Sequence, residues 1–333
     1  MAEGPLICAE GYLFELERRG YIQAGAFVPE AVLDHPEKVT ELHREFVHAG
    51  SDVVEAFTYY AHREKMRIVG KEDRLEELNR QALALAKEVA DETGTLFAGD
   101  ICNTNVFDPA DEGSKSAVRA MFEEQVGWAA EAGVDFVIAE TFSYAEETKM
   151  AVETIKAAGL PAVATMIVHQ EPETRDGLSL AEACAVYEQA GADVVGLNCG
   201  RGPRTMLPLL PAIVERVSCH VAALPVPYRT HEHEPTFQSL TDPQWDGMAF
   251  PTALEPLTCN RYELAEFATE AAGIGVNYIG ICCGNSPHFL RSVAEALGRK
   301  PSASRYSPDM SKHAYFGDDP SLKDGNRTFA ERL

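Results

Sequence analysis

Three cysteines follow two apolar runs that are far apart in the sequence. VGLNCGRGP carries Cys199, and IGICCGNSP carries Cys282 and Cys283. Three thiolates that leave one tetrahedral position open are the ligand pattern of a catalytic zinc ion. Neighbouring strand residues point to opposite faces, so Cys282 and Cys283 can share one ion only where the strand has ended; Gly284 permits that bend. A lone Cys199 would more simply be a small buried hydrophobe, but the adjacent pair favours a Zn²⁺ site.

The cysteine-bearing runs are two of eight apolar, β-prone runs that alternate with amphipathic stretches. The predicted strands are 5–9, 52–60, 95–101, 135–142, 161–168, 193–199, 220–226 and 277–283, and predicted helices include 36–50, 116–133, 179–191 and 260–275. Apolar runs without alternation are typical of strands covered on both faces. Eight strand-then-helix units predict an α/β fold, a (β/α)8 TIM-type barrel over residues 1–299. A doubly wound open sheet is the alternative, but AEGYLF is not the Gly-rich phosphate turn that usually opens one.

The C-terminal ends of barrel strands form the mouth where chemistry occurs. Besides the three cysteines, the predicted strand ends carry Glu10, Tyr59, Tyr60, Glu140, Thr141 and Asn198. We therefore expect these side chains to converge with the thiols on one rim. His231 and His233 form a competing metal pair in a long loop, but no third ligand is evident there, which favours a solvated or lid role.

Two segments fall outside the repeat. Residues 227–258, after the seventh strand, are too many for an ordinary connection and predict a lid or packing arm. Residues 300–333 are polar with scattered aromatics, which predicts a C-terminal tail or an arm that embraces a second subunit of a homo-oligomer.

Charge and composition exclude several classes of partner. Lys and Arg number 29 against 52 Asp and Glu, a formal charge of −23. This acidity repels nucleic-acid backbones and anionic membrane surfaces. The N-terminal stretch has no signal-peptide pattern and no apolar run could span a membrane, so we expect a cytoplasmic protein whose cysteines are thiols or metal ligands.

The chain resembles the homocysteine S-methyltransferase family, most closely its betaine–homocysteine S-methyltransferase branch, over roughly residues 4–300. VDFVIAE, VVGLNC, LEP and YIGICCG carry the resemblance, together with the long segment that begins GYLFELERRG. It implies that Cys199, Cys282 and Cys283 hold zinc and that the substrate thiol is the fourth ligand. It also implies that Glu140 binds the homocysteine amino group.

The resemblance further implies an aromatic pocket for a cationic methyl donor, to which Phe27, Tyr59 and Tyr60 correspond. Aromatic faces attract an onium group that has no N–H to donate. Thr141 and Phe27 stand where the branch has tyrosine and tryptophan. Ala9-Glu10-Gly11 replaces the family's Asp-Gly-Gly, so either Glu10 substitutes for the missing Asp or homocysteine is held differently.

The predicted function is zinc-dependent methyl transfer from a betaine-like onium donor to homocysteine, giving methionine. Glycine betaine is the first choice of donor, and a sulfonium such as dimethylsulfoniopropionate or S-methylmethionine is the alternative. Because Ala9 departs from the family, a catalytically silent zinc-binding relative is the alternative of another class. A Schiff-base aldolase is disfavoured because no predicted strand end carries a lysine. A metal-dependent hydrolase lacks an identified water-activating base.

Overall fold

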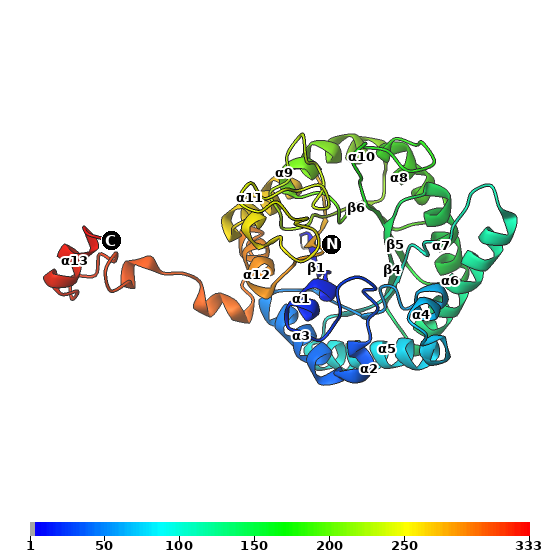
Figure 1. The fold of residues 1–333 in the computed structure, drawn as a ribbon, viewed down its shortest axis with the longest axis horizontal. Coiled ribbons are helices and arrows are strands. Elements are labelled where there is room, and N and C mark those ends of the chain that lie inside the picture. Colours follow the sequence, from blue (N-terminus) through cyan, green and yellow to red (C-terminus); the bar gives the residue numbers. More distant parts are fainter. Residues whose placement is uncertain (1–3) are drawn as a thin grey trace.

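Eight parallel strands close into a barrel in the computed structural model, which describes residues 4–333 (Figure 1). The strands are β1 Leu6–Ala9, β2 Val53–Glu55, β3 Leu96–Cys102, β4 Phe136–Phe142, β5 Ala162–Met166, β6 Val194–Asn198, β7 His220–Leu224 and β8 Tyr278–Ile281. They pair in sequence order, and β8 closes on β1 with Leu6 opposite Tyr278. The predicted (β/α)8 barrel is confirmed and the open sheet is wrong. Residues 1–3 of the predicted domain lie outside the described residues.

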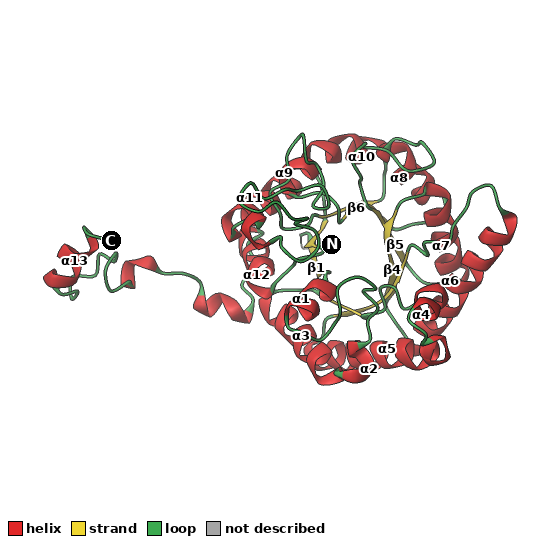
Figure 2. Cartoon of the chain, viewed as in Figure 1, coloured by secondary structure: helices red, strands yellow, loops and turns green. Residues whose placement is uncertain are grey.

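Helices surround the barrel as an outer ring (Figure 2). They are α1 Tyr12–Arg18, α2 Ala31–Asp34, α3 Pro36–Ala49, α4 Arg63–Ile68, α5 Leu75–Thr93, α6 Glu112–Ala132, α7 Ala145–Ala157, α8 Leu180–Gln189, α9 Pro203–Met206, α10 Leu210–Arg216, α11 Arg261–Ile274 and α12 Pro287–Ala296. A further helix, α13 Asp324–Ala330, lies in the C-terminal tail, away from this ring. Short 3₁₀ helices are η1 Glu72–Arg74, η2 Leu207–Leu209, η3 Glu255–Leu257, η4 Ser302–Tyr306 and η5 Met310–Lys312.

Local capping explains where the predicted helices begin. Ser179 and Glu182 form a capping box at the start of α8, and Asn260 and Glu263 form another at α11. Each box satisfies backbone N–H groups that the first helical turn leaves free. Helix α6 begins before the predicted residue 116, because Asp111 accepts a hydrogen bond from the Gly113 N–H and caps an earlier turn.

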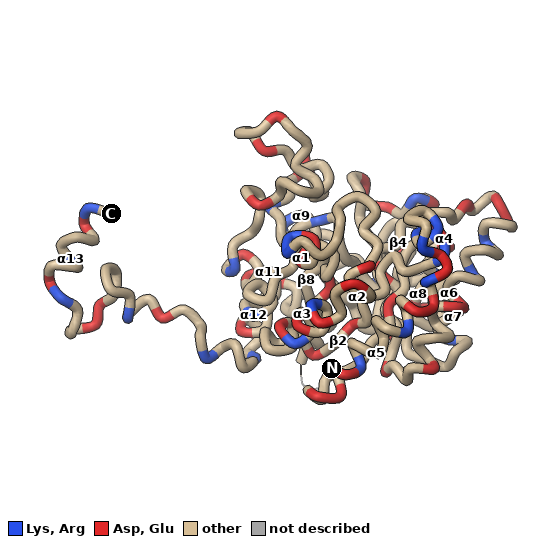
Figure 3. The backbone as a smooth tube through the Cα atoms, turned by 60° about the horizontal axis from the view of Figure 1, so that its bottom comes forward, with Lys and Arg blue, Asp and Glu red and all other residues tan. Residues whose placement is uncertain are grey.

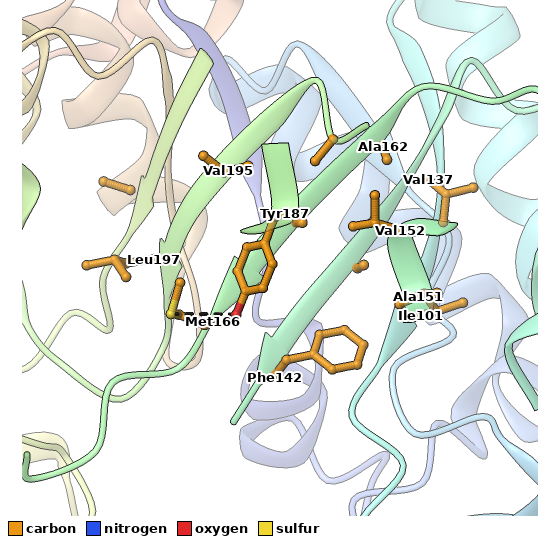
Figure 4. Packing of buried hydrophobic residues seen from close by; sticks show 14 of the residues in the cluster. Ile101, Val137, Phe142, Ala151, Val152, Ala162, Met166, Tyr187, Val195 and Leu197 are labelled. Carbon is orange, nitrogen blue, oxygen red and sulfur yellow. Dashed lines mark hydrogen bonds between the residues drawn. The ribbon is translucent and has the colours of Figure 1, made fainter. Parts of the chain in front are cut away.

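Both faces of the strands are buried, as the continuous apolar runs predict. All seven residues of β4 are buried. Val137 packs outward against the helices with Val195 and Leu197, as Figure 4 shows for the layer beneath α7 and α8. Because side chains alternate along a strand, Glu140 lies on the opposite, inward face from Val137. The outward faces hold the helical ring in place, and the inward faces supply the site.

Strand β2 is shorter than predicted. The sequence prediction extended it to residue 60, but the strand ends at Glu55 and the chain turns at once. The Thr58 N–H donates to the Ala56 carbonyl at 2.8 Å, and the Ala61 N–H donates to the Thr58 carbonyl at 2.8 Å. Tyr59 and Tyr60 therefore lie in the loop above the barrel and not in the strand.

The long loop and the tail differ in how they meet the barrel. Residues 227–258 pack on it, and the Phe237 N–H donates to the Gly200 carbonyl at 2.8 Å. Residues 307–333 extend away from the barrel, with α13 at the far end (Figure 1). Their role as an oligomerisation arm, and that of 227–258 as a lid, stay predictions.

Acidic residues are spread over the helical ring with basic residues between them (Figure 3). Many form surface ion pairs, such as Arg44 with Glu88 and Glu92. Within residues 4–333, no helix is both long and apolar enough to cross a membrane.

Candidate active site

The three predicted cysteines meet at the barrel mouth. Cys199 directly follows β6, while Cys282 and Cys283 directly follow β8. Their sulfur atoms all lie within 4.8 Å of one another. Cys199 and Cys282 are buried and Cys283 is partly exposed, so the group is reached from one side. The convergence expected from the sequence is confirmed.

The end of β7 holds both cysteine segments in place. The Cys199 N–H donates to the Leu224 carbonyl at 2.9 Å, and the Cys282 N–H donates to the Pro225 carbonyl at 2.9 Å. Gly284 has a φ of 95°, which allows the bend after the cysteine pair. At Gly11, a Cβ atom would lie 2.4 Å from the Cys282 carbonyl oxygen, so only glycine fits against this segment.

A small inner cavity of about 20 Å³ lies beside the thiols and is lined by carboxylates. Glu55, Asp100 and Glu140 have oxygen atoms within 4.8 Å of one another, and all three side chains are buried. Glu10 lies within the same distance of Glu140 and Cys282. One oxygen each of Glu10, Glu55 and Asp100 is buried without a hydrogen-bond partner among residues 4–333. Such oxygens favour a cationic or hydrogen-donating ligand.

Asn198 at the end of β6 holds the acidic side chains together. Its Nδ2 donates to Glu140 Oε2 at 2.6 Å and lies 3.1 Å from Glu10 Oε2. Its Oδ1 accepts the Thr141 N–H at 3.0 Å, and Thr141 Oγ1 donates to Glu140 at 2.9 Å. Asn198 and Thr141 therefore position the carboxylates through hydrogen bonds, although neither of these two residues lines the inner cavity itself.

The crowding of acids changes their protonation. Burial and the neighbouring Glu140 raise the pKa of Glu10, while burial and Asp100 raise the pKa of Glu140 and of Glu55. Without a cation the cluster therefore retains protons, because several buried like charges cannot all form together. Among the thiols, hydrogen bonds from Cys282 and Cys283 lower the pKa of Cys199.

An outer pocket of about 290 Å³ opens on the other side of the thiols. Its lining includes Cys199, Cys283, Thr141 and six aromatic rings, namely Phe14, Phe27, Tyr59, Tyr60, Phe237 and Phe250. Cys283 and Tyr59 line both cavities. The long loop thus supplies two of these rings, Phe237 and Phe250.

The rings form two packed groups around this pocket. In the first group, Phe14 stacks on Phe27 with centroids 5.6 Å apart, Phe14 lies 5.9 Å from Phe237, and Phe237 meets Phe250 at 5.0 Å. Tyr59 and Tyr60 are 4.3 Å apart. The Lys65 ammonium lies 4.0 Å from the Tyr60 ring centroid, so this ring already has a cation on one face.

Backbone conformation independently marks the outer pocket. Within residues 4–333, the non-glycine residues with positive φ are Phe27, Tyr60, Asn105, Thr141 and Cys199, with φ between 53° and 63°. All five line this pocket. Such conformations are unfavourable, above all for a β-branched residue such as Thr141, and they concentrate at functional sites.

The structure also adds residues that the sequence prediction left out of the site. Glu55 and Asp100 line the inner cavity, while Phe14, Phe237 and Phe250 line the outer pocket. Glu55 within the apolar run VVEAF and Asp100 at the end of the predicted strand 95–101 are the signals in the sequence that could have indicated the inner cavity. His231 instead pairs with Glu234 at 2.9 Å, and the described metal-ligating clusters include neither His231 nor His233.

Comparison with known proteins agrees with this architecture. The family model described as homocysteine S-methyltransferase matches residues 7–297. Betaine–homocysteine S-methyltransferase 1 from Mus musculus is 35% identical over 317 residues, covering 92% of this chain and 75% of the relative. S-methylmethionine–homocysteine S-methyltransferase BHMT2 from Rattus norvegicus is 34% identical over 313 residues, covering 92% and 82%. The metallated form of the Escherichia coli homocysteine methyltransferase MmuM shares the fold, with a TM-score of 0.69, 18% identity and coverage of 88% and 96%.

The fold and the groups at its mouth place the chain among the (β/α)8-barrel enzymes. More specifically, the chain belongs to the homocysteine S-methyltransferase family. It is therefore an S-methyltransferase whose acceptor is homocysteine.

Proposed function

We propose that this protein transfers a methyl group from a betaine-like onium donor to homocysteine in a zinc-dependent reaction, giving methionine. One observation carries the proposal. Three thiols lie between an inner cavity lined by carboxylates and an outer pocket lined by aromatic rings. The acceptor's ammonium group matches the first cavity, and a cationic donor matches the second.

The cluster of three cysteine thiols fits a zinc ion. Tetrahedral zinc with sulfur ligands at about 2.3 Å places its sulfurs about 3.8 Å apart. The three sulfur atoms lie within 4.8 Å of one another, so small side-chain rotations bring them to that spacing. Soft thiolate ligands select zinc over magnesium or calcium. Held by Cys199, Cys282 and Cys283, zinc would bind the homocysteine thiol as a deprotonated, nucleophilic sulfur.

The inner carboxylates orient the acceptor. Glu140 and Glu10 lie beside Cys282, so a homocysteine sulfur at the thiols places its ammonium group near the buried oxygens. Binding of a cation also allows the acids to release the protons that their crowding retains. Glu10 thereby takes the place of the aspartate that the family has one residue earlier.

The outer pocket aligns the donor methyl group with the acceptor sulfur. The sulfur lone pair forms the new S–CH₃ bond, and the electron pair of the breaking C–N or C–S⁺ bond remains on the donor heteroatom. The negative charge of the thiolate and the positive charge of the onium centre neutralise each other in this step. A pocket that excludes water therefore favours the transition state, provided that substrate binding offsets the cost of removing both charges from water. The aromatic rings exclude water and attract the onium group.

Sequence identity does not select the donor, because the two relatives named for betaine and for S-methylmethionine match almost equally well. The test is methionine formation by zinc-loaded, reduced protein with homocysteine and, separately, glycine betaine, dimethylsulfoniopropionate and S-methylmethionine. We expect turnover with glycine betaine first. A preference for a sulfonium would select the alternative donor class, and no turnover with any donor would refute an onium reaction.

Replacing one pocket ring tests the aromatic assignment. Tyr60→Ala removes a ring from the outer pocket, and we expect the KM for the donor to rise about 10-fold with the KM for homocysteine nearly unchanged. Steady-state kinetics with each substrate varied in turn measures both. Tyr21→Ala is the matched control, since Tyr21 also faces a lysine but does not line the pocket. A larger effect on homocysteine than on donor would contradict the assignment.

A further inference from the structure

Arg175 is a basic residue of the outer pocket that the reaction described so far does not use. It lies in the connection from β5 to α8 and lines the pocket together with Cys199 and Cys283. Among residues 4–333 it forms no ion pair. Its guanidinium carbon lies 5.6 Å from the Tyr144 ring centroid, a contact that leaves its N–H donors without a carboxylate.

Asp176, the acidic residue next to Arg175 in the sequence, forms hydrogen bonds with other groups. Asp176 accepts the Ala145 N–H at 2.9 Å and the Glu146 N–H at 3.0 Å. These bonds satisfy free N–H groups at the start of α7, where a negative charge is also favoured by the helix dipole. Asp176 therefore does not neutralise Arg175, and the guanidinium remains free to meet an anion from the pocket.

The backbone around Arg175 is fixed in place. The Arg175 N–H donates to the Ser143 carbonyl at 2.8 Å, which ties the loop to the end of β4. A hydrogen bond joins Thr174 and Leu178 across the turn, with the Thr174 N–H donating to the Leu178 carbonyl at 2.9 Å. Arg201 donates to the carbonyls of His169 and Gln170 at 2.9 and 2.7 Å. A fixed loop reduces the entropy lost when a ligand binds.

The two cavities carry opposite charge. The inner cavity is lined by Glu55, Asp100 and Glu140, whereas no Asp or Glu lines the outer pocket. His169 is the other titratable base of the outer pocket, and burial together with Arg175 lowers the pKa of His169, so it is neutral at pH 7. Arg175 is therefore the permanently charged side chain among those that line the outer pocket.

We propose that Arg175 binds the carboxylate of the methyl donor and so selects zwitterionic donors that carry a carboxylate but no ammonium group. This inference rests on the proposed function. Arg175 lines the same pocket as the aromatic rings and the thiols, so its guanidinium can meet the carboxylate of a donor whose onium group lies among the rings. Glycine betaine and dimethylsulfoniopropionate have this pattern. S-methylmethionine also carries an ammonium group. The outer pocket has no carboxylate to bind this group, and Arg175 would repel it.

The test compares donors that differ only at the end distant from the reacting methyl. Dimethylsulfoniopropionate carries the carboxylate, and trimethylsulfonium lacks it while keeping the sulfonium centre. We expect Arg175→Gln to lower kcat/KM for dimethylsulfoniopropionate and glycine betaine about 10- to 100-fold, chiefly through KM. The value for trimethylsulfonium and the KM for homocysteine should stay within about 2-fold of the parent.

Controls separate recognition from a structural role. Arg175→Lys keeps the charge and should recover part of the loss, and Arg216→Gln, at the end of α10, should behave as the parent protein. If Arg175→Gln lowers kcat/KM equally for both sulfonium donors, or does not lower it for the donors that carry a carboxylate, the role of Arg175 is overturned. If the parent protein uses trimethylsulfonium as well as it uses dimethylsulfoniopropionate, carboxylate selection is refuted while onium transfer stands. No turnover with any onium donor would refute the proposed function itself, and this inference with it.

Discussion

Cys282→Ser should abolish both stoichiometric zinc and methyl transfer. A serine hydroxyl is a hard group that does not ionise near neutral pH, so it is a poor substitute for a thiolate on zinc. Mutation of residues that only hydrogen-bond to metal ligands already reduces metal affinity or activity by about 10- to 100-fold. Loss of one of three direct ligands should therefore reduce turnover by more than about 100-fold. Metal analysis of the purified, reduced protein and methionine formation measure the two effects.

A second buried cysteine provides the matched control. Cys184 in α8 is fully buried in the outer core and belongs to no metal-ligating cluster among the described residues. Cys184→Ser places a hydroxyl among apolar groups and should lower stability by about 1–3 kcal/mol, yet it should retain zinc and turnover. Full activity in Cys282→Ser, with an intact fold by circular dichroism, would refute the zinc mechanism.

The barrel and the thiol site could be predicted because each depends on short-range patterns. Strands buried on both faces are apolar throughout, so β4 to β8 are evident as runs. The C-terminal ends of all parallel strands meet at one mouth, so Cys199 and Cys282 converge whatever the details of packing. Glu140 and Asn198 follow from the same rule.

Other parts of the site depend on information that the sequence does not show locally. Glu55 and Asp100 face inward only because of the register of β2 and β3, and a shift by one residue would reverse that facing. Phe237 and Arg175 lie in long connections whose course is set by distant carbonyls, those of Gly200 and Ser143. Such contacts join residues far apart in the chain, and local pattern carries no sign of them.

Glu140→Gln should raise the KM for homocysteine about 100-fold and leave the donor KM nearly unchanged. The substitution keeps the shape of the side chain but removes the charge that meets the acceptor's ammonium group. Removing one partner of a buried, hydrogen-bonded charge pair costs about 3–5 kcal/mol, which corresponds to a factor of 100 or more. Steady-state kinetics with homocysteine varied at saturating donor measures the effect.

A variant of Glu147 is the control for that change, and a variant of Glu10 tests whether Glu10 and Glu140 both bind the homocysteine ammonium group. Glu147 is equally buried but accepts hydrogen bonds from Thr104 at 2.9 and 2.7 Å, outside both cavities, so Glu147→Gln should leave the KM for homocysteine unchanged. Glu10→Gln should raise that KM as well, because Glu10 presents an unpartnered oxygen to the same ligand. If Glu10→Gln has no effect while Glu140→Gln does, Glu10 does not replace the missing aspartate and Glu140 alone holds the ammonium group. If neither variant affects homocysteine, the inner cavity is not its binding site.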